Sequence, residues 1–303
     1  MAKLKEGKGL GICYGILGVV LFSSKAVMVK MAYEYQVPTL DLLLFRMFFS
    51  VPFYILIVLW VSKNNTETTA TRTDFLWIVL FGFLGYYLAS YFDFLGLNYI
   101  KASLERIILF TYPTIVVLLS WLFFKKKISM VQVVAILITY AGILLTFFNE
   151  LDFSGNEILL GVFLILLSAL TYASYLVGSG WLIPKFGVLL FTSYAMIIST
   201  LCVLIHYALM GDWNLYSYPW QVYALGLAMA VFATLIPSFL VSKSIQILGA
   251  SNFSILGSLG PISTIILAYV FLNERLTFWQ FVGMAIVIYG ITYLSLRTKK
   301  QAN

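Results

Sequence analysis

The sequence predicts an all-α membrane protein whose ten transmembrane helices form two inverted five-helix repeats, with both termini cytoplasmic. Three observations lead to this fold class: an apolar composition, ten long apolar segments and a likeness between the two halves of the chain. Of the 303 residues, 62% are hydrophobic and only 10% are charged. Soluble domains are roughly 45–50% apolar and about 25% charged, so this chain has too few charges to cover a water-exposed surface.

The same composition excludes an intrinsically disordered protein, because disorder requires low hydrophobicity. A net charge of +7 would suit a nucleic-acid binder, but the basic residues lie between apolar segments, as in the cytoplasmic loops of membrane proteins. Cys13 and Cys202 each lie inside an apolar run and lack metal-ligand spacing. We therefore expect the lipid bilayer as a partner, and no nucleic acid, metal or cofactor.

Ten segments of the chain are long enough to span a bilayer, which takes about 20 mostly apolar residues. Their connections are short and leave no room for a soluble domain. The first segment is predicted to be a retained helix rather than a signal peptide, because Lys25 and Lys30 stand where a small-residue cleavage site belongs. The predicted spans are roughly 9–31, 40–62, 75–98, 103–124, 130–149, 158–180, 188–210, 222–246, 252–272 and 278–296.

The basic residues in the loops predict the orientation, since cytoplasmic loops carry an excess of Lys and Arg. With the N-terminus inside, thirteen basic residues fall on the cytoplasmic side and four on the outer side. The four outer residues are Lys30, Lys101, Arg106 and Arg275. We therefore expect both ends of the chain in the cytoplasm.

The two halves of the chain resemble each other at an offset of 148 residues. Five helices is an odd number, so the second copy enters the membrane upside down, as in secondary transporters that bind substrate between their repeats. We therefore divide the chain into repeats at residues 1–149 and 150–303. Matched pairs include Ala102 and Ala250, Ser103 and Ser251, Pro113 and Pro261, Gln132 and Gln280, and Gly142 and Gly290.

A family resemblance is carried by residues 260–294, GPISTIILAYVFLNERLTFWQFVGMAIVIYGITYL. They combine a proline within a helix, a Glu-Arg-Leu turn and a last helix with glycines, and LLLFRMFFS at 42–50 places Arg46 in the second helix. With these motifs the chain resembles the EamA-type ten-helix transporters of the drug/metabolite transporter superfamily. It departs from the pattern at Lys126, where the first repeat lacks the acid. The motif positions are Pro261, Glu274, Arg275, Leu276, Gly283 and Gly290.

The resemblance implies a multi-pass carrier of the bacterial cytoplasmic membrane. Such carriers move small metabolites, often amino acids leaving the cell, without hydrolysing ATP. The sequence agrees about ATP, because it contains no GxxxxGK phosphate loop.

Charges within the spans are candidates for the substrate site, because a charge in a membrane is costly and usually functional or paired. Lys25, Arg46 and Asp93 each lie about six residues from the outer end of their helix, or roughly 9 Å deep. Lys25 or Arg46 could face a substrate carboxylate, and Asp93 could face an ammonium group or carry a proton. Alternatively, Arg46 and Asp93 form a structural ion pair and Lys25 snorkels to the interface. Glu105 and Arg106 are expected at the interface.

Two prolines, Pro113 and Pro261, lie near the middle of their predicted helices. Each would free the carbonyl four residues earlier, that of Leu109 or Gly257, which must then line a cavity or find a protein partner. The prolines are therefore candidate hinges or cavity walls, and a tolerated packing kink is the alternative. Polar neighbours, Tyr112 and Ser258 among them, are candidates for binding substrate.

Tyrosines offer an apolar wall with a hydrogen-bonding tip, so Tyr91 and Tyr175, which lie among serines and threonines, are candidates for lining the site. The aromatic residues at 213–220 fit an interfacial belt instead. His206 is the single histidine, and coupling to protons through it competes with a plain interfacial position.

These features predict a secondary transporter, a monomer or homodimer, for a small-molecule substrate. It would export amino acids or related compounds by alternating access. The alternative is uptake or exchange of an anionic or phosphorylated metabolite. An enzyme is disfavoured by the single histidine and the single clearly embedded acid, and a channel by the lack of a ring of like charges.

Overall fold

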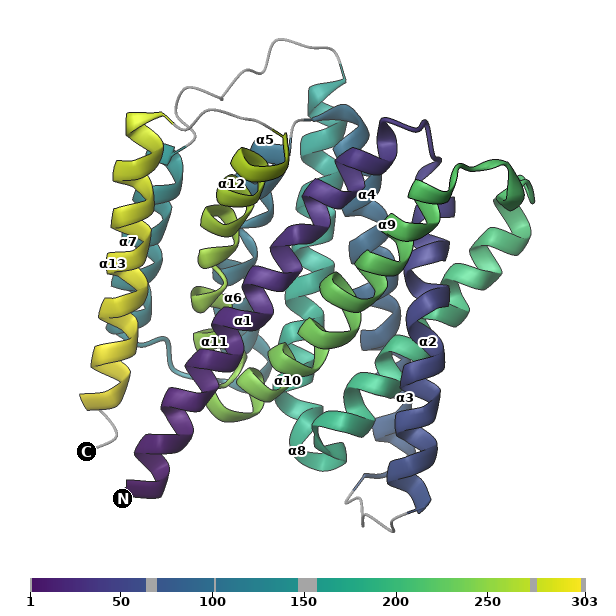
Figure 1. Ribbon diagram of the computed structural model, residues 1–303. Helices are drawn as coiled ribbons and strands as arrows, with labels where there is room; N and C mark the ends of the chain where they lie inside the picture. The colour runs from purple at the N-terminus through teal and green to yellow at the C-terminus, as the bar shows by residue number, and fades with distance from the viewer. Residues whose placement is uncertain (1, 64–69, 101, 147–156, 273–276, 301–303) are drawn as a thin grey trace.

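The computed structural model describes residues 2–63, 70–100, 102–146, 157–272 and 277–300, and every regular element in these ranges is a helix (Figure 1). The Glu-Arg-Leu turn at 274–276 lies outside the described residues. The elements are α1 (Ala2–Tyr33), α2 (Thr39–Lys63), α3 (Arg72–Gly82), η1 (Phe83–Leu88), α4 (Ala89–Tyr99), α5 (Ala102–Leu109), α6 (Tyr112–Phe124), α7 (Met130–Thr146), α8 (Ile158–Met210), η3 (Leu215–Ser217), α9 (Trp220–Ala230), η4 (Val231–Leu235), α10 (Ile236–Leu248), α11 (Ala250–Leu256), α12 (Leu259–Leu272) and α13 (Phe278–Lys300).

Six helical stretches of the described chain are long and apolar enough to cross a membrane, which agrees with a multi-pass membrane protein. Two predicted spans lie within α8, which consists of two helices joined at Gly187. The φ angle of Gly187 is +76°, a conformation that glycine adopts without steric cost. The count of ten spans stays a prediction, because α6 and α7 contain 13 and 17 residues, fewer than the about 20 that a span needs.

Two π-helical segments interrupt the bundle at corresponding places in the two halves of the chain. The π-helix η1 begins at Phe83 and η4 begins at Val231, 148 residues later, which is the offset found in the sequence. The corresponding stretches run in opposite directions, because α3 to α4 ascends in Figure 1 while α9 to α10 descends. Likewise α5 to α6 descends and α11 to α12 ascends, and α7 lies beside α13.

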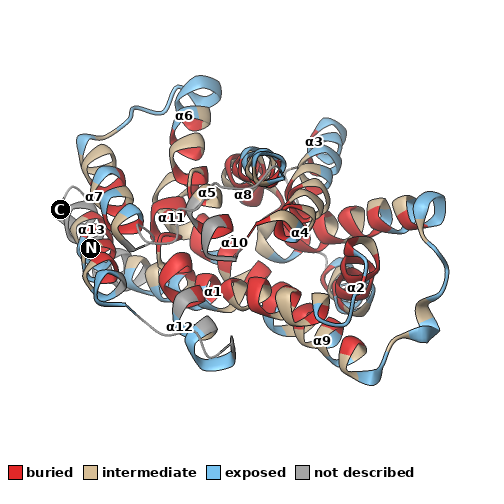
Figure 2. Cartoon of the chain, turned by 90° about the horizontal axis from the view of Figure 1, so that it is seen from above, coloured by how far each residue is buried: buried red, intermediate tan, exposed pale blue. Residues whose placement is uncertain are grey.

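The centre of the bundle is formed by helices that pack closely through small residues. Helix α1 packs against α10 and α12, and α8 packs against α4 and η1. Seen from above, the buried faces of these helices turn toward one another, while α7 and α13 stand at one side (Figure 2). A Cβ atom at Gly11 would lie 2.7 Å from Ile247 Cγ2, and one at Gly18 would lie 3.0 Å from Val241 Cγ2. Larger side chains there would push α1 away from α10.

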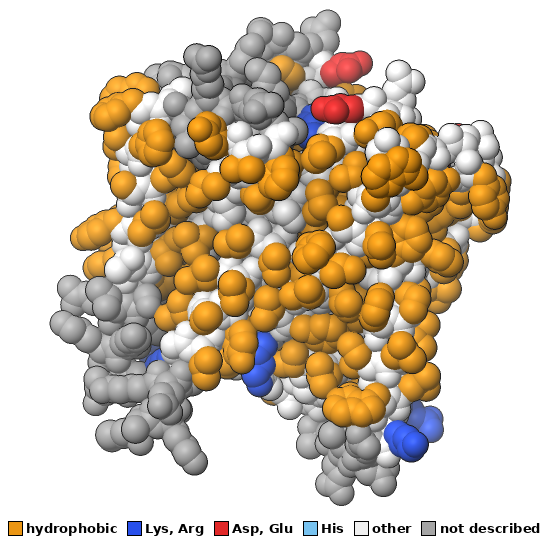
Figure 3. All heavy atoms as spheres, viewed as in Figure 1, with side chains coloured by type: hydrophobic (Ala, Val, Ile, Leu, Met, Phe, Trp, Pro, Cys, Tyr) orange, Lys and Arg blue, Asp and Glu red, His pale blue; other side chains and the backbone are white. Residues whose placement is uncertain are grey.

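The outer surface carries a broad apolar band (Figure 3). Large apolar side chains such as Leu56, Trp60 and Leu76 are more than half exposed on it. Lys and Arg side chains are visible mainly at the lower end, where α1 begins and α13 ends, and the visible acidic side chains lie at the upper end. Such a surface suits lipid contact between two polar faces.

Helix α4, which carries Asp93, is held at its C-terminal end by a lysine from α1. Lys30 Nζ donates to the carbonyl oxygens of Leu97 at 2.7 Å and Ile100 at 3.1 Å. A cation at a helix C-terminus satisfies carbonyls that have no partner within the helix. We expect Lys30→Met to lower the free energy of unfolding by about 1.5–3 kcal/mol, the contribution of hydrogen bonds to a charged group. Thermal unfolding in detergent measures this, and an unchanged unfolding temperature would contradict it.

Candidate functional site

A cavity of about 90 Å³ lies among the central helices. Its walls come from α1, α2, η1, α4, α5, α6, α8, α11 and α12, so residues far apart in the sequence meet there. The lining combines aromatic side chains with three cations, Lys25, Arg46 and Arg106, and among the described residues no carboxylate lines it. The aromatic side chains are Phe22, Tyr86, Phe110, Tyr112, Tyr172 and Phe253. The site therefore offers an apolar enclosure with positive charge.

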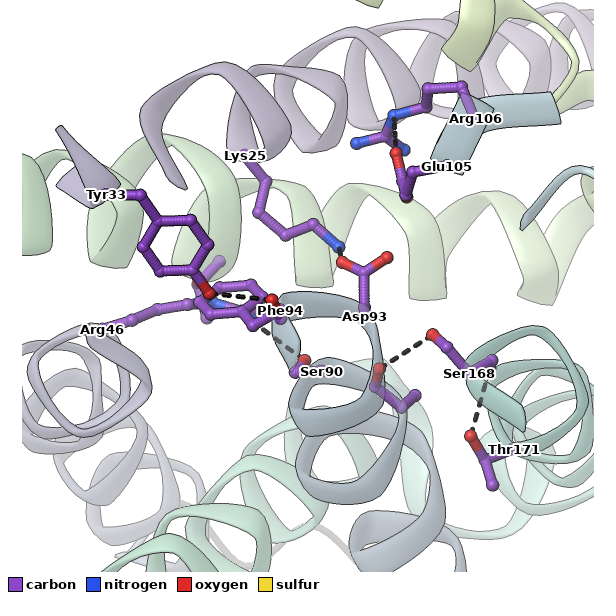
Figure 4. A network of polar contacts seen from close by, with 12 residues as sticks. Lys25, Tyr33, Arg46, Ser90, Asp93, Phe94, Glu105, Arg106, Ser168 and Thr171 are labelled. Atoms are coloured by element: carbon purple, nitrogen blue, oxygen red, sulfur yellow. Dashed lines mark hydrogen bonds and ion pairs between the residues drawn. The ribbon is translucent and has the colours of Figure 1, made fainter. Parts of the chain in front are cut away.

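Lys25 is neutralised by an acid on another helix. Its Nζ atom on α1 donates to Asp93 Oδ2 on α4, and Asp93 is buried (Figure 4). The pair joins the first and third predicted spans at one depth. Because Lys25 has this partner, it does not reach out to the membrane interface, which was one of the two alternatives for this residue.

Arg46 is held in place by hydroxyl groups rather than by an acid. Its Nε donates to Thr234 Oγ1 at 2.7 Å, and Nη1 donates to Ser90 Oγ at 3.0 Å. The guanidinium carbon lies 5.6 Å from the centre of the Phe94 ring, and only 1% of the residue is exposed. In the part of the chain that the structure describes, Arg46 makes no ion pair. The alternative ion pair between Arg46 and Asp93 is therefore wrong, because Lys25 occupies Asp93.

Glu105 and Arg106 lie on α5, and Arg106 lines the cavity. Glu105 is fully buried and Arg106 nearly so, with Arg106 Nε 3.0 Å from Glu105 Oε2. The structure buries both residues within the bundle, and their predicted position at the membrane interface stays a prediction. Helix α5 is covered by its contacts with α8 and α12.

The charges at the cavity do not cancel. Lys25 faces Asp93 and Arg106 faces Glu105, while Arg46 has hydroxyl partners alone. Three cations and two carboxylates, each in its ordinary form, leave one positive charge in excess. A buried uncompensated charge is costly in a membrane, so an anionic group entering the cavity would supply the missing counter-ion.

Comparison with models of protein families shows to which family the chain belongs. The model of the EamA-like transporter family matches two stretches, residues 9–148 and 159–296. The chain belongs to the EamA-like transporter family. This EamA-like transporter is thus a multi-pass membrane protein from a family of transporters rather than of enzymes, and the resemblance found in its motifs is confirmed.

Individual relatives cover nearly the whole EamA-like transporter. It is 30% identical over 309 residues to an uncharacterized transporter of Bacillus subtilis, YcbK, with 99% of this chain and 98% of the relative covered. The uncharacterized transporter sll1319 of Synechocystis is 27% identical, with 94% and 93% covered. A solved crystal structure is similar in fold, with a TM-score of 0.76 and 13% identity over 97% of this chain and 99% of the other.

The predicted site residues of this EamA-like transporter divide between the cavity and its surroundings. Lys25, Arg46 and Tyr112 line the cavity, and Asp93 lies directly behind Lys25. Tyr175 and Ser258 are buried but do not line it: Tyr175 contacts the ring of Tyr86 at 4.9 Å, and the Ser258 hydroxyl donates to the Ile255 carbonyl at 2.6 Å. Roles for these residues in substrate binding stay predictions.

Tyr91 faces away from the cavity and contacts the single histidine. The two rings lie 4.9 Å apart, and the hydroxyl of Tyr87 lies 3.0 Å from His206 Nδ1. These three residues lie on η1, α4 and α8, and none of them lines the cavity. Tyr91 was singled out by its hydroxyl-bearing neighbours in the sequence, which do not give the direction of its helix face.

The two prolines begin new helices rather than kinking long ones. Pro113 lies in the first turn of α6, and Pro261 in the first turn of α12, where a missing N–H costs nothing. The carbonyl of Gly257, predicted to be free, accepts from the Gly260 N–H at 2.8 Å. Pro261 lines the cavity and Pro113 does not. A hinge role stays a prediction for both.

Several site residues were missed because single polar residues in apolar runs look like packing. Ser90 and Thr234, which hold Arg46, lie on different halves of the chain, and only the fold brings them together. Glu105 and Arg106 had a usable indication. At the offset of 148 residues they fall on Phe253 and Ser254, which lie inside an apolar stretch, and this places them deeper than a loop.

Proposed function

We propose that this protein is a secondary active transporter that moves a small polar metabolite by alternating access. Its ten membrane-spanning helices would form two inverted repeats, at 1–149 and 150–303, with both termini cytoplasmic. Two observations support the repeats. The starts of η1 and η4 are separated by the repeat offset of 148 residues, and α3–α4 runs in the opposite direction to α9–α10. The basic lower end, where α1 begins and α13 ends, supports the orientation. We place the protein in the bacterial cytoplasmic membrane, as a monomer or homodimer.

The substrate carries a negatively charged group, and Arg46 is the observation that carries this proposal. A guanidinium with two hydroxyl partners and no ion pair among the described residues keeps donors for a planar anion. Amino acids and related compounds leaving the cell are the first candidates. Their carboxylate would bind Arg46, and their side chain would lie among the aromatic walls.

A second candidate is favoured by the cations that line the cavity. Lys25, Arg46 and Arg106 all reach it, while Asp93 and Glu105 lie behind them. This arrangement suits an anionic or phosphorylated metabolite, taken up or exchanged, at least as well as a zwitterion. The cavity volume of about 90 Å³ limits either candidate to a small molecule in this conformation.

Polar links at opposite ends of the bundle support alternating access. At the lower end, Lys185 Nζ, beside the bend of α8, binds Asp74 Oδ1 at the start of α3 at 2.6 Å. At the upper end, the Tyr218 hydroxyl donates to Asp41 Oδ2 at the start of α2 at 2.6 Å. Burial raises the pKa of the Tyr218 phenol, with Asp41 contributing, so Tyr218 stays a donor at physiological pH. Breaking one link at a time would open the bundle to one side.

Counterflow in proteoliposomes tests the proposal. Vesicles are loaded with an unlabelled probe, and uptake of the same labelled probe is followed without ATP. We expect counterflow of a carboxylate-bearing probe, with L-alanine representing the zwitterions and succinate and glycerol 3-phosphate the anions. Ethanolamine, which has no anionic group, should not be moved. Counterflow of ethanolamine alone, or of no probe beyond the level of protein-free vesicles, would contradict the proposal.

A further inference from the structure

Two carboxyl groups lie behind the cavity on neighbouring helices. Asp93 on α4 and Glu105 on α5 are 1% and 0% exposed. Figure 4 shows an Asp93 oxygen turned toward Lys25 and a Glu105 oxygen turned toward Arg106, and the two acids act on each other electrostatically. Arg46 alone suffices for an anionic substrate, so this acid pair calls for a separate explanation.

The hydrogen bonding of the two carboxyl groups is incomplete, although Arg106 Nε and Nη2, which are donors beside Glu105, also have no hydrogen-bond partner among the described residues. Asp93 Oδ2 accepts from Lys25, but Asp93 Oδ1 and both oxygens of Glu105 accept no hydrogen bond from the described residues. The contact between Arg106 Nε and Glu105 Oε2 at 3.0 Å brings opposite charges together without the alignment of a hydrogen bond. Buried carboxylates that lie close together repel each other when both are ionised, so the pair is a favourable place for one added proton.

The surroundings of the pair are fixed by a small number of charged and titratable groups. On α1 these are Lys25, which binds Asp93, and Lys30 and Tyr33 farther toward the upper end. On α2 it is Arg46, and on α5 it is Arg106. Tyr112 on α6 and Tyr172 on α8 act on Arg106 from across the cavity. His206 contacts Tyr87 and Tyr91 on another face of the bundle.

We propose that Asp93 and Glu105 together form a proton-binding site, and that they take up one proton when an anionic group binds in the cavity. This inference rests on the proposed function. Lys25 and Arg106 line the cavity in front of the two acids, so a proton on the pair removes one negative charge from behind them. The excess positive charge facing the cavity then rises from one to two. An anion and a proton therefore favour each other's binding, and the coupling is reciprocal.

The coupling also gives the direction of transport. Because the proton and the anion occupy the protein together, they cross the membrane together. A carrier of this kind takes up its substrate when the outer side is more acidic than the cytoplasm. Uptake of substrate together with protons therefore favours the second candidate function, transport of an anionic metabolite, over export of amino acids.

Infrared difference spectroscopy tests the proton site without any substrate. Purified protein in detergent is titrated from roughly pH 9 to pH 5, the range in which buried carboxyl groups take up protons, and the carbonyl band of a protonated carboxyl group is followed. We expect a band in the wild type that is lost or shifted in both Asp93→Asn and Glu105→Gln. Asp41→Asn is the matched control, because Asp41 is also a buried acid but lies apart from the cavity. A wild type without the band, or with a band untouched by either substitution, would overturn the proposal.

The link to anion binding is tested with acetate, which fits the cavity and stays ionised between pH 6 and pH 9. The rise in unfolding temperature with acetate concentration gives its half-saturating concentration, with chloride as the salt control. We expect this concentration to be at least about fivefold lower at pH 6 than at pH 9 in the wild type. In Glu105→Gln, which is permanently uncharged, the two values should be equal. Equal values in the wild type, an unaltered ratio in Glu105→Gln, or no stabilisation by acetate at either pH would refute the coupling.

The two proposals fail in different ways. If counterflow is absent for every probe but the infrared band behaves as expected, the transport function is wrong and the proton site stands. If counterflow proceeds normally and the band is absent, the proton site is wrong and the transporter stands. If either acid variant does not fold, the wild-type titration and the other variant still decide the question.

Discussion

Replacing Arg46 by lysine is expected to raise the half-saturating substrate concentration in counterflow by about 10- to 100-fold. Lysine keeps the positive charge, but it lacks the planar fork that bonds Thr234 and Ser90 while facing the cavity. The loss of one hydrogen bond to a charged group, about 1.5–3 kcal/mol, corresponds to this change in affinity. The measurement is counterflow over a series of probe concentrations.

A matched control separates binding from folding. Arg72→Lys makes the same chemical change at an exposed position at the start of α3, and its transport should equal that of the wild type. Arg46→Lys should unfold within a few degrees of the wild type, since its charge is retained. If its half-saturating concentration were unchanged, Arg46 would not contact the substrate. If it unfolded much earlier with normal affinity in the folded fraction, its role would be structural.

The sequence was sufficient to predict an all-helical, multi-pass membrane protein, because apolar membrane-spanning segments are encoded locally. Apolar segments, loop charges and the offset of 148 residues need no knowledge of tertiary contacts. The places where the helices are interrupted were harder to predict from the sequence. Pro113 and Pro261 marked the right places, but whether a proline bends one helix or begins another depends on the backbone before it. The π-helices at Phe83 and Val231 had no sequence indication at all.

For the charged residues of the site, the sequence predicted how far each lies along its helix but not which way its side chain points. The equal depth of Lys25, Arg46 and Asp93 was correctly taken to mean one polar level, and the structure places them together. The pairing was not predictable, because it depends on how each helix is rotated about its axis. A rotation of one residue, about 100°, decides whether Lys25 or Arg46 meets Asp93.

The charges of the site are unequally divided between the two halves of the chain. Lys25, Arg46, Asp93, Glu105 and Arg106 all lie before residue 149. The second half contributes hydroxyl, aromatic and small residues, including Thr234, Phe253 and Gly257. The offset that relates the halves therefore predicts the scaffold but not its chemistry. Substitutions in the first half should change charge selectivity, and substitutions in the second should change the space available.

Gly257→Ala is expected to reduce counterflow by about 10- to 100-fold and to lower the free energy of unfolding by about 1–3 kcal/mol, the usual cost of overpacking. A Cβ atom at Gly257 would overlap the Tyr112 hydroxyl and lie 2.9 Å from Tyr112 Cζ. Tyr112 is buried, its ring contacts Tyr172 and it lines the cavity, so a displaced Tyr112 ring would change the shape of the cavity. The added methyl group therefore both strains the junction of α11 and α12 and occupies the substrate's space. Counterflow and unfolding in detergent measure the two effects.

The double variant Gly257→Ala with Tyr112→Phe identifies the cause. Removing the hydroxyl relieves the overlap but leaves the ring carbon close, so transport and stability should return in part. This non-additivity is the mark of two residues in contact. Gly9→Ala is the control, because a Cβ there meets nothing within 4 Å and should change neither property. If the double variant were as impaired as the sum of the single ones, the Tyr112 hydroxyl would not be what Gly257 accommodates, and the close approach of α11 to α6 would need another cause.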